Sequence, residues 1–516
     1  MVRVRAALVR LLLAAALAVS SSAANAQPGC GLDTNGFCPR GGGGGNKNLV
    51  WYIVGGTVIA IVGALVGYKV YTDQNSNPPP SGPTFQPPPN PPPFNTAALP
   101  PDPQLTPPAP RVTPKGPVTA QLRNGFNLPP PGITAYVDNE VMLDIPSTVP
   151  NRILDLIASS HNMTRLETRT FRLTGRTLHR WRINNGSTVP DMIMNMARDR
   201  QATQVAGAQP IYLYEMAQAE VVEPNRDQYA PEKLDLTEAH RLATGSRVLV
   251  AVIDSGVDAT HPDLADAIVD KYDATGDEFA PHAHGTGMAG AIAAHRTMLG
   301  TAPRVGLLTA RAFGAKAASA EGTSFNIIKA LDWAVEKGAR VINMSFAGPP
   351  DPRLRDALAK TAKKGIVLIA AAGNAGPRSP PLFPAADPNV IAVTATDIDD
   401  ALFPGANRGK HIAVAAPGVD VLVPGPNATY QLTTGTSVAS AEVSGVAALL
   451  LERNPKLTPA DVRRILTRTA KAIGPKGRES DFGAGLVNAY GAVSAARSGS
   501  VSSTGKGTGT ASTARP

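Results

Sequence analysis

The C-terminal half of the sequence predicts an α/β fold, an open and mostly parallel sheet with helices on both faces. Between about residues 225 and 496, apolar runs that suit buried strands alternate with segments of helical period. The strand-like runs are 248–253, 306–311, 340–343, 365–370 and 390–394. The helical segments are 287–294, 324–336, 352–364 and 436–454. Apolar strands that alternate with helices are typical of a parallel sheet covered on both sides.

The N-terminus predicts an export signal over residues 1–26. A basic start is followed by the apolar run 11–19 and by the small-residue end Ala24-Asn25-Ala26. The next segment, 27–47, is rich in glycine and holds the two cysteines, Cys30 and Cys38. In an oxidising compartment they could form a disulfide, and no histidine cluster accompanies them to indicate a zinc site.

Residues 48–70 predict one transmembrane helix. The 21 residues from Asn48 to Tyr68 carry no charge and are flanked by Lys47 and Lys69. At about 1.5 Å per residue they just cover a hydrocarbon core of about 30 Å. A cleaved signal followed by one span would leave the C-terminal part in the cytoplasm. The excess of Arg and Lys before the span instead favours a C-terminal part outside the cytoplasm, in the periplasm or at the cell surface.

Three further segments complete the expected organisation. Residues 71–132 form a proline-rich linker, because 18 prolines between 78 and 118 exclude helix and sheet and favour an extended spacer. Residues 133–220 predict a small α+β domain, with strands near 140–145, 169–173, 178–183 and 210–215 and helices near 152–159 and 189–200. Residues 497–516 are mostly Ser, Gly and Thr, a composition typical of disorder.

The net charge of +9 raises the question of nucleic-acid binding. Lys and Arg are spread over the whole chain, and no basic run is interleaved with aromatic residues. Neither a finger motif nor a helix-turn-helix pattern is present. The charge therefore indicates a solvated surface, and we expect no nucleic-acid partner.

Three short segments place chemically useful side chains where a parallel α/β sheet puts its ligands, beyond the carboxyl ends of the strands. Asp254 follows the strand 248–253 in VLVAVIDSG, and His284 stands just before an Ala-rich helix in HGTGMAG. Ser437 begins a long apolar helix in GTSVASAEVSG. Each of these alone suits an ordinary turn or helix cap.

Together, the three residues have the chemistry of an acyl-transfer site. A serine hydroxyl is a poor nucleophile until an imidazole takes its proton. That imidazole needs a carboxylate to hold its tautomer and offset its charge. Helix N-termini also supply N–H groups where an oxyanion develops. The pattern therefore predicts Ser437 as nucleophile, His284 as general base and Asp254 as orienting acid.

Seven collinear strings resemble the subtilisin-like serine proteases over about residues 225–495, within an expected peptidase domain of 221–496. They are VAVIDSGVDATHPDL, HGTGMAG, VINMSFAGP, LIAAAGNAG, VIAVTA, VAAPG and GTSVAS. The resemblance implies a serine endopeptidase that works through an acyl-enzyme. It also implies that Asn374 supplies the oxyanion-hole amide. The resemblance also implies two groups of substrate-binding residues. An edge strand that pairs with the substrate is formed by Ser345, Phe346, Ala347 and Gly348. One wall of the substrate pocket is formed by Ala371, Ala372 and Gly373.

The sequence departs from the family pattern at several places. Ala441 replaces a usual proline, which suits a helix, and Ala347 replaces a usual glycine in the substrate groove. With a short loop after Asn374 and Leu382 near the pocket floor, we expect an uncharged pocket for small or medium apolar side chains. The stretch 294–302, where many relatives bind calcium, carries no carboxylate. Asp263 alone does not make a site, so we expect neither metal nor cofactor.

The α+β segment resembles the inhibitory prodomain of the family. Its C-terminal stretch, 214–223, would then lie along the active site like a substrate. Cleavage by the enzyme itself near residues 215–230 would separate the peptidase from its membrane anchor. The expected partners are protein or peptide substrates, the chain's own prodomain, and the membrane through one helix.

Two other functions remain open from the residues. A pseudoprotease would use the same fold as an anchored binding module, although Asp254, His284, Asn374 and Ser437 are all present. A peptide ligase or cyclase would pass the same acyl-enzyme to an amine rather than to water. Nothing in the sequence excludes water or positions an amine, so hydrolysis is favoured.

The predicted base leads to a pH prediction. An unperturbed imidazole titrates near about pH 6.5, and only its neutral form accepts the serine proton. Peptide hydrolysis should therefore fall as the pH drops below neutrality. A rate profile measured from pH 4 to 9 checks this, and a profile that stays flat down to pH 4 would contradict the assignment of His284.

Overall fold

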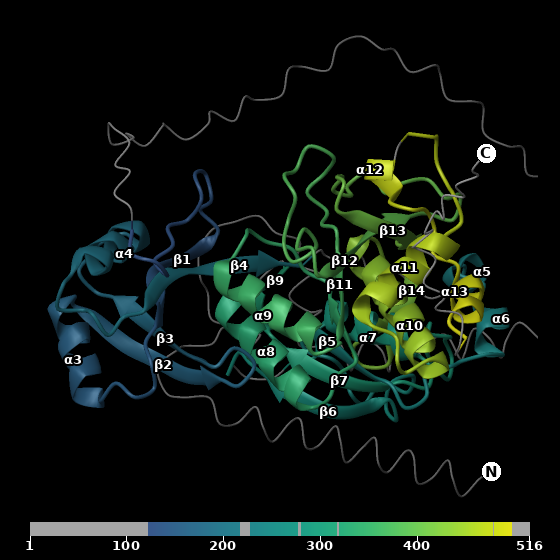
Figure 1. The fold of residues 1–516 in the computed structure, drawn as a ribbon. Helices are drawn as coiled ribbons and strands as arrows, with labels where there is room; N and C mark the ends of the chain where they lie inside the picture. Colours follow the sequence, from purple (N-terminus) through teal and green to yellow (C-terminus); the bar gives the residue numbers. More distant parts are fainter. Residues whose placement is uncertain (1–121, 217–227, 277–279, 317–318, 478, 498–516) are drawn as a thin grey trace, which may run out of the picture. The chain divides into compact units, whose positions relative to one another are not determined.

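The computed structural model describes residues 122–216, 228–276, 280–316, 319–477 and 479–497 (Figure 1). The predicted signal, cysteine segment, transmembrane helix, most of the linker and nearly all of the tail lie outside these residues. Within the described residues, no helix combines the length and apolarity that crossing a membrane requires.

The N-terminal part is an α+β unit that matches the predicted elements in type and order. Its strands are β1 (Tyr136–Asp144), β2 (Met163–Phe171), β3 (Arg176–Ile183) and β4 (Gly207–Glu215). Its helices are α3 (Asn151–Ser160) and α4 (Val189–Arg198). The strands pair in antiparallel fashion in the order β2-β3-β1-β4.

The α+β unit begins earlier than expected. Residues 122–132, assigned above to the linker, contact this unit. Phe126 is buried in its core, and the Arg123 guanidinium donates to the carbonyl oxygens of Met196 at 2.6 Å and Ala197 at 2.8 Å. These contacts satisfy carbonyl groups at the C-terminal end of α4, which have no partner within the helix. The proline composition of the preceding segment gave no signal of this change.

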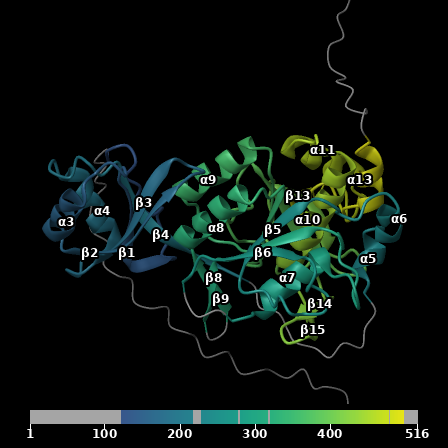
Figure 2. The same cartoon turned by 90° about the horizontal axis from the view of Figure 1, so that it is seen from below.

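The larger part contains a sheet of seven parallel strands. Their order is β13-β12-β11-β10-β5-β7-β6 (Figures 1 and 2). Five match the predicted runs: β5 (Leu249–Asp254), β7 (Gly306–Arg311), β10 (Val341–Met344), β11 (Val367–Ala371) and β12 (Val390–Thr396). The edge strands β6 (Ile268–Asp273) and β13 (Ile412–Pro417) were not predicted.

Side chains alternate between the two faces of this sheet. Val250 and Val252 of β5 point into one apolar cluster with α7 (Ala283–Ala293) and α10 (Thr436–Arg453). Ala251 and Ile253 point into a second cluster with α8 (Ser324–Glu336) and α9 (Pro352–Lys363). Because successive side chains of a strand face opposite ways, apolar residues at every position require cover on both sides.

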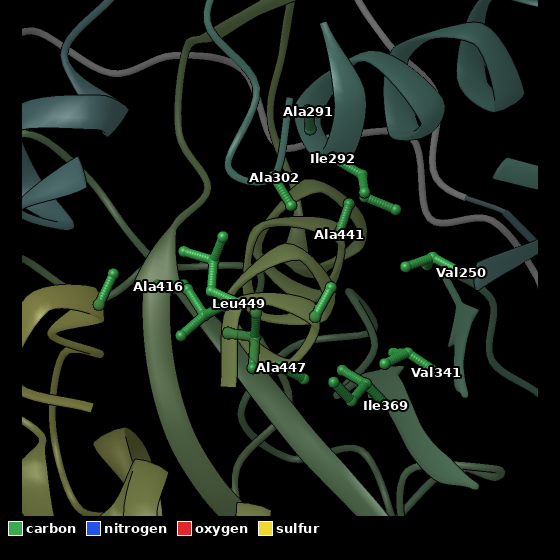
Figure 3. Close-up of a cluster of buried hydrophobic side chains, with 14 of the residues drawn as sticks. Val250, Ala291, Ile292, Ala302, Val341, Ile369, Ala416, Ala441, Ala447 and Leu449 are labelled. Atoms are coloured by element: carbon green, nitrogen blue, oxygen red, sulfur yellow. The ribbon is translucent and has the colours of Figure 1, made fainter. Parts of the chain in front are cut away.

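Helix α10 occupies the centre of the first cluster. It is buried continuously from Thr436 to Leu451. Ala441, Ala447 and Leu449 lie among residues of α7 and of several sheet strands (Figure 3). A helix that is apolar on all sides belongs in the core. Ala441, at the position where the family usually has proline, is fully buried within it.

Smaller elements complete this part of the chain. The helices α5 (Ala230–Lys233), α6 (Leu236–His240), α11 (Pro459–Thr469), α12 (Glu479–Phe482) and α13 (Ala489–Ala495) were not predicted. A hairpin of β14 (Val421–Gly425) and β15 (Thr429–Thr433) contacts α7. Strands β8 (Phe313–Lys316) and β9 (Ser319–Thr323) do not join the parallel sheet.

Strands β8 and β9 instead extend the sheet of the α+β unit. Strand β9 pairs in antiparallel fashion with β4, giving the order β2-β3-β1-β4-β9-β8. Polar contacts accompany the pairing. The backbone N–H of Leu173 donates to Asp332 of α8 at 2.6 Å, and the Gln209 side chain donates to Asp351, the N-cap of α9, at 2.9 Å. The α+β unit is therefore bound along α8 and α9.

The buried Glu442 of α10 leads to a stability prediction. Burial raises the pKa of its carboxyl from 4.5 to about 8, against a hydrogen bond from Thr301 that lowers it. A pKa above the unfolded value means that the contribution to stability is complete below about pH 4.5 and is lost as pH rises through about 8. Replacing Glu442 by Gln should remove this loss, worth roughly 2–4 kcal/mol near pH 9.

Thermal melts of the wild type and Glu442→Gln between pH 5 and 9 check this. The two should converge at pH 5 and separate steadily as the pH rises, with the variant the more stable. The exposed Glu479→Gln serves as the control. A constant difference across the range would show that Glu442 does not titrate in the folded protein.

Candidate active site

The sheet topology brings Asp254 and the start of the 345–348 segment together. After β5 the chain builds β6 and β7 on one side of the sheet, then crosses to β10 on the other side. Asp254 is the last residue of β5, and Ser345 follows the last residue of β10. In open parallel sheets the ligand site lies at such a change of direction, beyond the carboxyl ends of the strands.

His284 lies beside Asp254, as the sequence predicted. Its Nδ1 is 2.8 Å from Asp254 Oδ1, and both side chains are buried. The sequence placed His284 just before the helix, but α7 begins at Ala283, because the side chain of His282 caps its N-terminus. The backbone N–H of His282 also donates to Gly256 O at 2.8 Å, which fixes the start of α7 against the turn after β5.

Ser437 is the second residue of α10. Its hydroxyl donates to the carbonyl oxygen of Ser345 at 3.2 Å. His284 Nε2 is buried and has no hydrogen-bond partner among the described residues. The Asp254–His284 pair is thus formed in this structure, while the serine hydroxyl is bonded elsewhere. Catalytic hydrogen bonds often tighten only when substrate binds.

A hollow of about 290 Å³ lies over Ser437. Asn374 lines it, and its Oδ1 accepts from the Thr436 backbone N–H at 3.0 Å and from Thr436 Oγ1 at 2.8 Å. A backbone N–H can only donate, so these bonds assign the oxygen to Thr436 and leave the Asn374 NH₂ for other acceptors. The Gly373 N–H donates to Thr436 Oγ1 at 3.0 Å, so Thr436 holds both Gly373 and Asn374 at the hollow.

Most of the predicted substrate-binding residues line this hollow. They are Ser345, Phe346, Ala347, Ala371 and Gly373, and the expected Leu382 lines it as well. Gly348 and Ala372 do not line it. The backbone of Gly348 pairs with Phe383, and the buried Ala372 donates to Val393 O. Thr436 and Ala375 also line the hollow, and the sequence analysis did not predict them. Each is adjacent in the chain to a predicted residue, Ser437 or Asn374, and this adjacency could have indicated them.

The chain's own residues 214–216 lie against the edge formed by 345–348. Glu215 and Ala347 form an antiparallel bridge, with N–H to O distances of 3.0 and 3.1 Å. Glu215 and Met216 line the hollow together with Ser437. Tyr214 is buried edge-on against Phe346 and donates from its hydroxyl to Pro349 O at 2.9 Å. A peptide in extended form can therefore bind this edge.

The candidate calcium residue has protein partners. Asp263 Oδ1 accepts the backbone N–H groups of residues 296–298, and Tyr430 Oη donates to Oδ2 at 2.7 Å. Burial opposes ionisation, but these hydrogen bonds outweigh it and lower the pKa of the carboxyl. Across the described ranges, no group of three or more His, Cys, Asp and Glu side chains could hold a metal ion.

Comparison with known proteins gives a consistent result. The model of the subtilase family matches residues 245–485. Thermitase of Thermoactinomyces vulgaris is 35% identical over 274 residues, 52% of this chain and 95% of thermitase. Subtilisin Savinase of Lederbergia lenta is 36% identical over 262 residues, 49% of this chain and 93% of that protein.

One solved structure supports the fold. Fervidolysin from Fervidobacterium pennivorans, a keratinolytic enzyme related to subtilisin, superposes with a TM-score of 0.61 at 24% identity. The match covers 72% of this chain and 63% of the length of fervidolysin. At this identity the likeness concerns the fold alone.

The parallel α/β fold and the site at its switch point define a hydrolase of the serine endopeptidase class. The extent and identity of the matches place the chain further: it belongs to the subtilase family.

Thr436 offers a test of how the Asn374 amide is held. Replacing Thr436 by Val removes the Oγ1 that binds both Asn374 and Gly373 but keeps the backbone N–H. With Asn374 as the oxyanion donor that the sequence predicts, turnover should fall about tenfold with little change in KM, because loss of such a donor costs about 10²–10³ in turnover and this variant would only loosen it. Steady-state kinetics measure this, with Thr434→Val in the same loop as the matched control. Equal kcat values for the two variants would contradict the proposed support.

Proposed function

We propose that Ser437 attacks the scissile peptide carbonyl while His284 takes its proton. Asp254 holds the imidazole in the tautomer that exposes Nε2 and stabilises the charge that forms. The single observation that carries this proposal is the buried hydrogen bond between His284 Nδ1 and Asp254 Oδ1 at 2.8 Å. It leaves Nε2 without a partner among the described residues, and so able to accept the proton of Ser437. The acyl-enzyme is then hydrolysed by water.

The developing oxyanion is stabilised by the side-chain NH₂ of Asn374 and by the backbone N–H of Ser437. Thr436 occupies the Asn374 oxygen, so the amide can donate into the hollow. Ser437 stands in the first turn of α10, where backbone N–H groups are free and the helix dipole favours negative charge. Such donors are in place before the reaction begins and need no reorganisation.

Protein or peptide substrates bind as an extended strand along residues 345–347. The bridge between Glu215 and Ala347 supports this, since it is the pairing such a substrate would use. Ala371, Gly373 and Leu382 give the adjacent pocket an apolar, uncharged wall. We therefore expect cleavage after small or medium apolar residues.

The α+β unit acts as a prodomain that blocks the site until it is cut. Its last described residues already line the hollow over Ser437. The bridge pairs Glu215 with Ala347, and Ser345 stands two residues before Ala347 on that edge. The Ser345 carbonyl oxygen is 3.2 Å from Ser437 Oγ. Cleavage after Ala217 follows from this register, within the range of 215–230 expected from the sequence.

Export and anchoring complete the proposal. The signal at 1–26 and the span at 48–70 would hold the precursor at a membrane with the peptidase on its outer side. A cut after Ala217 lies C-terminal to the span, so it would break the covalent link between the peptidase and its anchor. The support here is the apolar pattern of the sequence.

The two alternatives predict different products. A pseudoprotease would not react at Ser437, yet Asp254 and His284 are paired as a working base requires. A ligase or cyclase would form the same acyl-enzyme and transfer it to an amine. The product would be a ligated or cyclic peptide, which mass spectrometry detects. Within the part of the chain that the structure describes, no specific contact favours either alternative.

A fluorophosphonate probe and the Ser437→Ala variant test the proposed function together. The wild-type protein should label on Ser437 and yield a new N-terminus at residue 218. Ser437→Ala should do neither, because it lacks the nucleophile. N-terminal sequencing of the purified protein, and of the variant expressed in the same way, measures the cut.

Two results would count against these assignments. Probe labelling that persists in Ser437→Ala would rule out this serine as the nucleophile. A variant trimmed at the same bond as the wild type would show that another protease makes the cut.

A further inference from the structure

A second histidine lies next to the candidate triad. His282 is two residues before His284, and its Nδ1 is 3.0 Å from Ser255 Oγ. Ser255 Oγ is in turn 3.2 Å from Asp254 Oδ1, the oxygen that binds His284. One buried hydroxyl thus connects His282 to the carboxylate.

The hydrogen bonds around Ser255 restrict which way its hydroxyl can point. Its oxygen already accepts the Gly285 backbone N–H at 3.1 Å. The hydroxyl proton can then go to His282 Nδ1 or to Asp254 Oδ1. His282 Nδ1 also accepts the backbone N–H of His284, at 3.3 Å, when it caps α7. This cap requires a lone pair on Nδ1, hence a neutral ring with its proton on Nε2.

Protonation of His282 reverses this arrangement. A protonated Nδ1 cannot accept from His284 N–H and instead donates to Ser255 Oγ. The Ser255 hydroxyl must then donate to Asp254 Oδ1, which already accepts from the Ser255 backbone N–H at 2.8 Å and from His284. Asp254 Oδ1 would then accept an additional hydrogen bond, and its negative charge would stabilise a protonated His284 less strongly. The new charge on His282 also repels the charge that forms on His284.

We infer that His282 is a positioning residue that acts on Asp254 through Ser255, and that its protonation weakens the triad. The inference rests on the proposed function of Asp254, His284 and Ser437. Among the described residues, the charged groups that act on His282 are Asp254 of β5 and His284 of α7. Burial lowers the pKa of His282, Asp254 opposes this shift, and His284 adds to it. Protonation of His282 should therefore weaken the triad only on the acid side of neutrality.

The shape of the pH profile tests the inference. In the wild type, kcat/KM between pH 5 and 9 should decline on the acid side through two ionisations, one of them that of His282. In His282→Asn the decline should follow one ionisation, because Asn Oδ1 takes the place of Nδ1 as acceptor but does not titrate. Acid limbs of the same shape in both proteins would overturn the inference.

Substitutions that remove the connection separate positioning from helix capping. At pH 8, His282→Ala should lose roughly fivefold to tenfold in kcat, the equivalent of about one hydrogen bond, and His282→Asn should restore most of it. In a Ser255→Ala background, adding His282→Ala should cause no further loss. A further loss of the same size in that background would show that His282 does not act through Ser255.

Two controls keep the outcomes interpretable. Titration of active sites with the fluorophosphonate probe normalises each rate to folded, reactive protein, and thermal melts report any loss of the α7 cap. If the wild type itself does not react with the probe, the proposed function fails. If it reacts and the His282 variants match it at every pH, only the inference about His282 fails.

Discussion

The arrangement of this molecule depends on one buried hydrogen bond, between His284 Nδ1 and Asp254 Oδ1. A carboxylate with no exposed surface needs donors, and Asp254 obtains them from the imidazole and from Ser255. The requirement constrains three elements at once. Strand β5 must end at Asp254, α7 must begin beside it, and the turn between them must be held, as it is by the bond from His282 N–H to Gly256 O.

Burial of α10 places the third group of the site. A helix enclosed on all sides has little freedom to shift, so the position of Ser437 in its first turn is set by core packing along its length. Small residues allow this close approach. A Cβ on Gly445 of α10 would come within 2.5 Å of the Thr301 side chain, and one on Gly290 of the neighbouring α7 within 2.1 Å of Pro424 of β14. Ser437 is therefore carried by a closely packed part of the fold.

The α+β unit contacts the rest of the described chain through strand pairing and side-chain hydrogen bonds as well as at the hollow over Ser437. Continuous pairing of β4 with β9, the bridge of Glu215 with Ala347, and the side-chain bonds to Asp332 and Asp351 form one connected interface. Burial raises the pKa of Asp351 despite the hydrogen bonds that oppose it. For the proposed prodomain, a cut in the chain that follows Met216 would leave all of these contacts in place, so cleavage and release would be separate events.

The sequence by itself determined the parallel α/β class and the strands and helices at the centre of the fold, and it proposed Asp254, His284, Asn374 and Ser437 as the site. These follow from apolar periodicity and from short motifs, which are local in the chain. Edge strand β6 carried a weaker signal because half of its residues are charged, and β13 because three of its six residues are alanine, which favours strands poorly. Only the tertiary structure decided that Gly348 and Ala372 do not line the hollow, that Thr436 binds the Asn374 oxygen, and that Ser255 connects His282 to Asp254. Each of these depends on which donors and acceptors meet across segments far apart in the chain, and no local pattern encodes that.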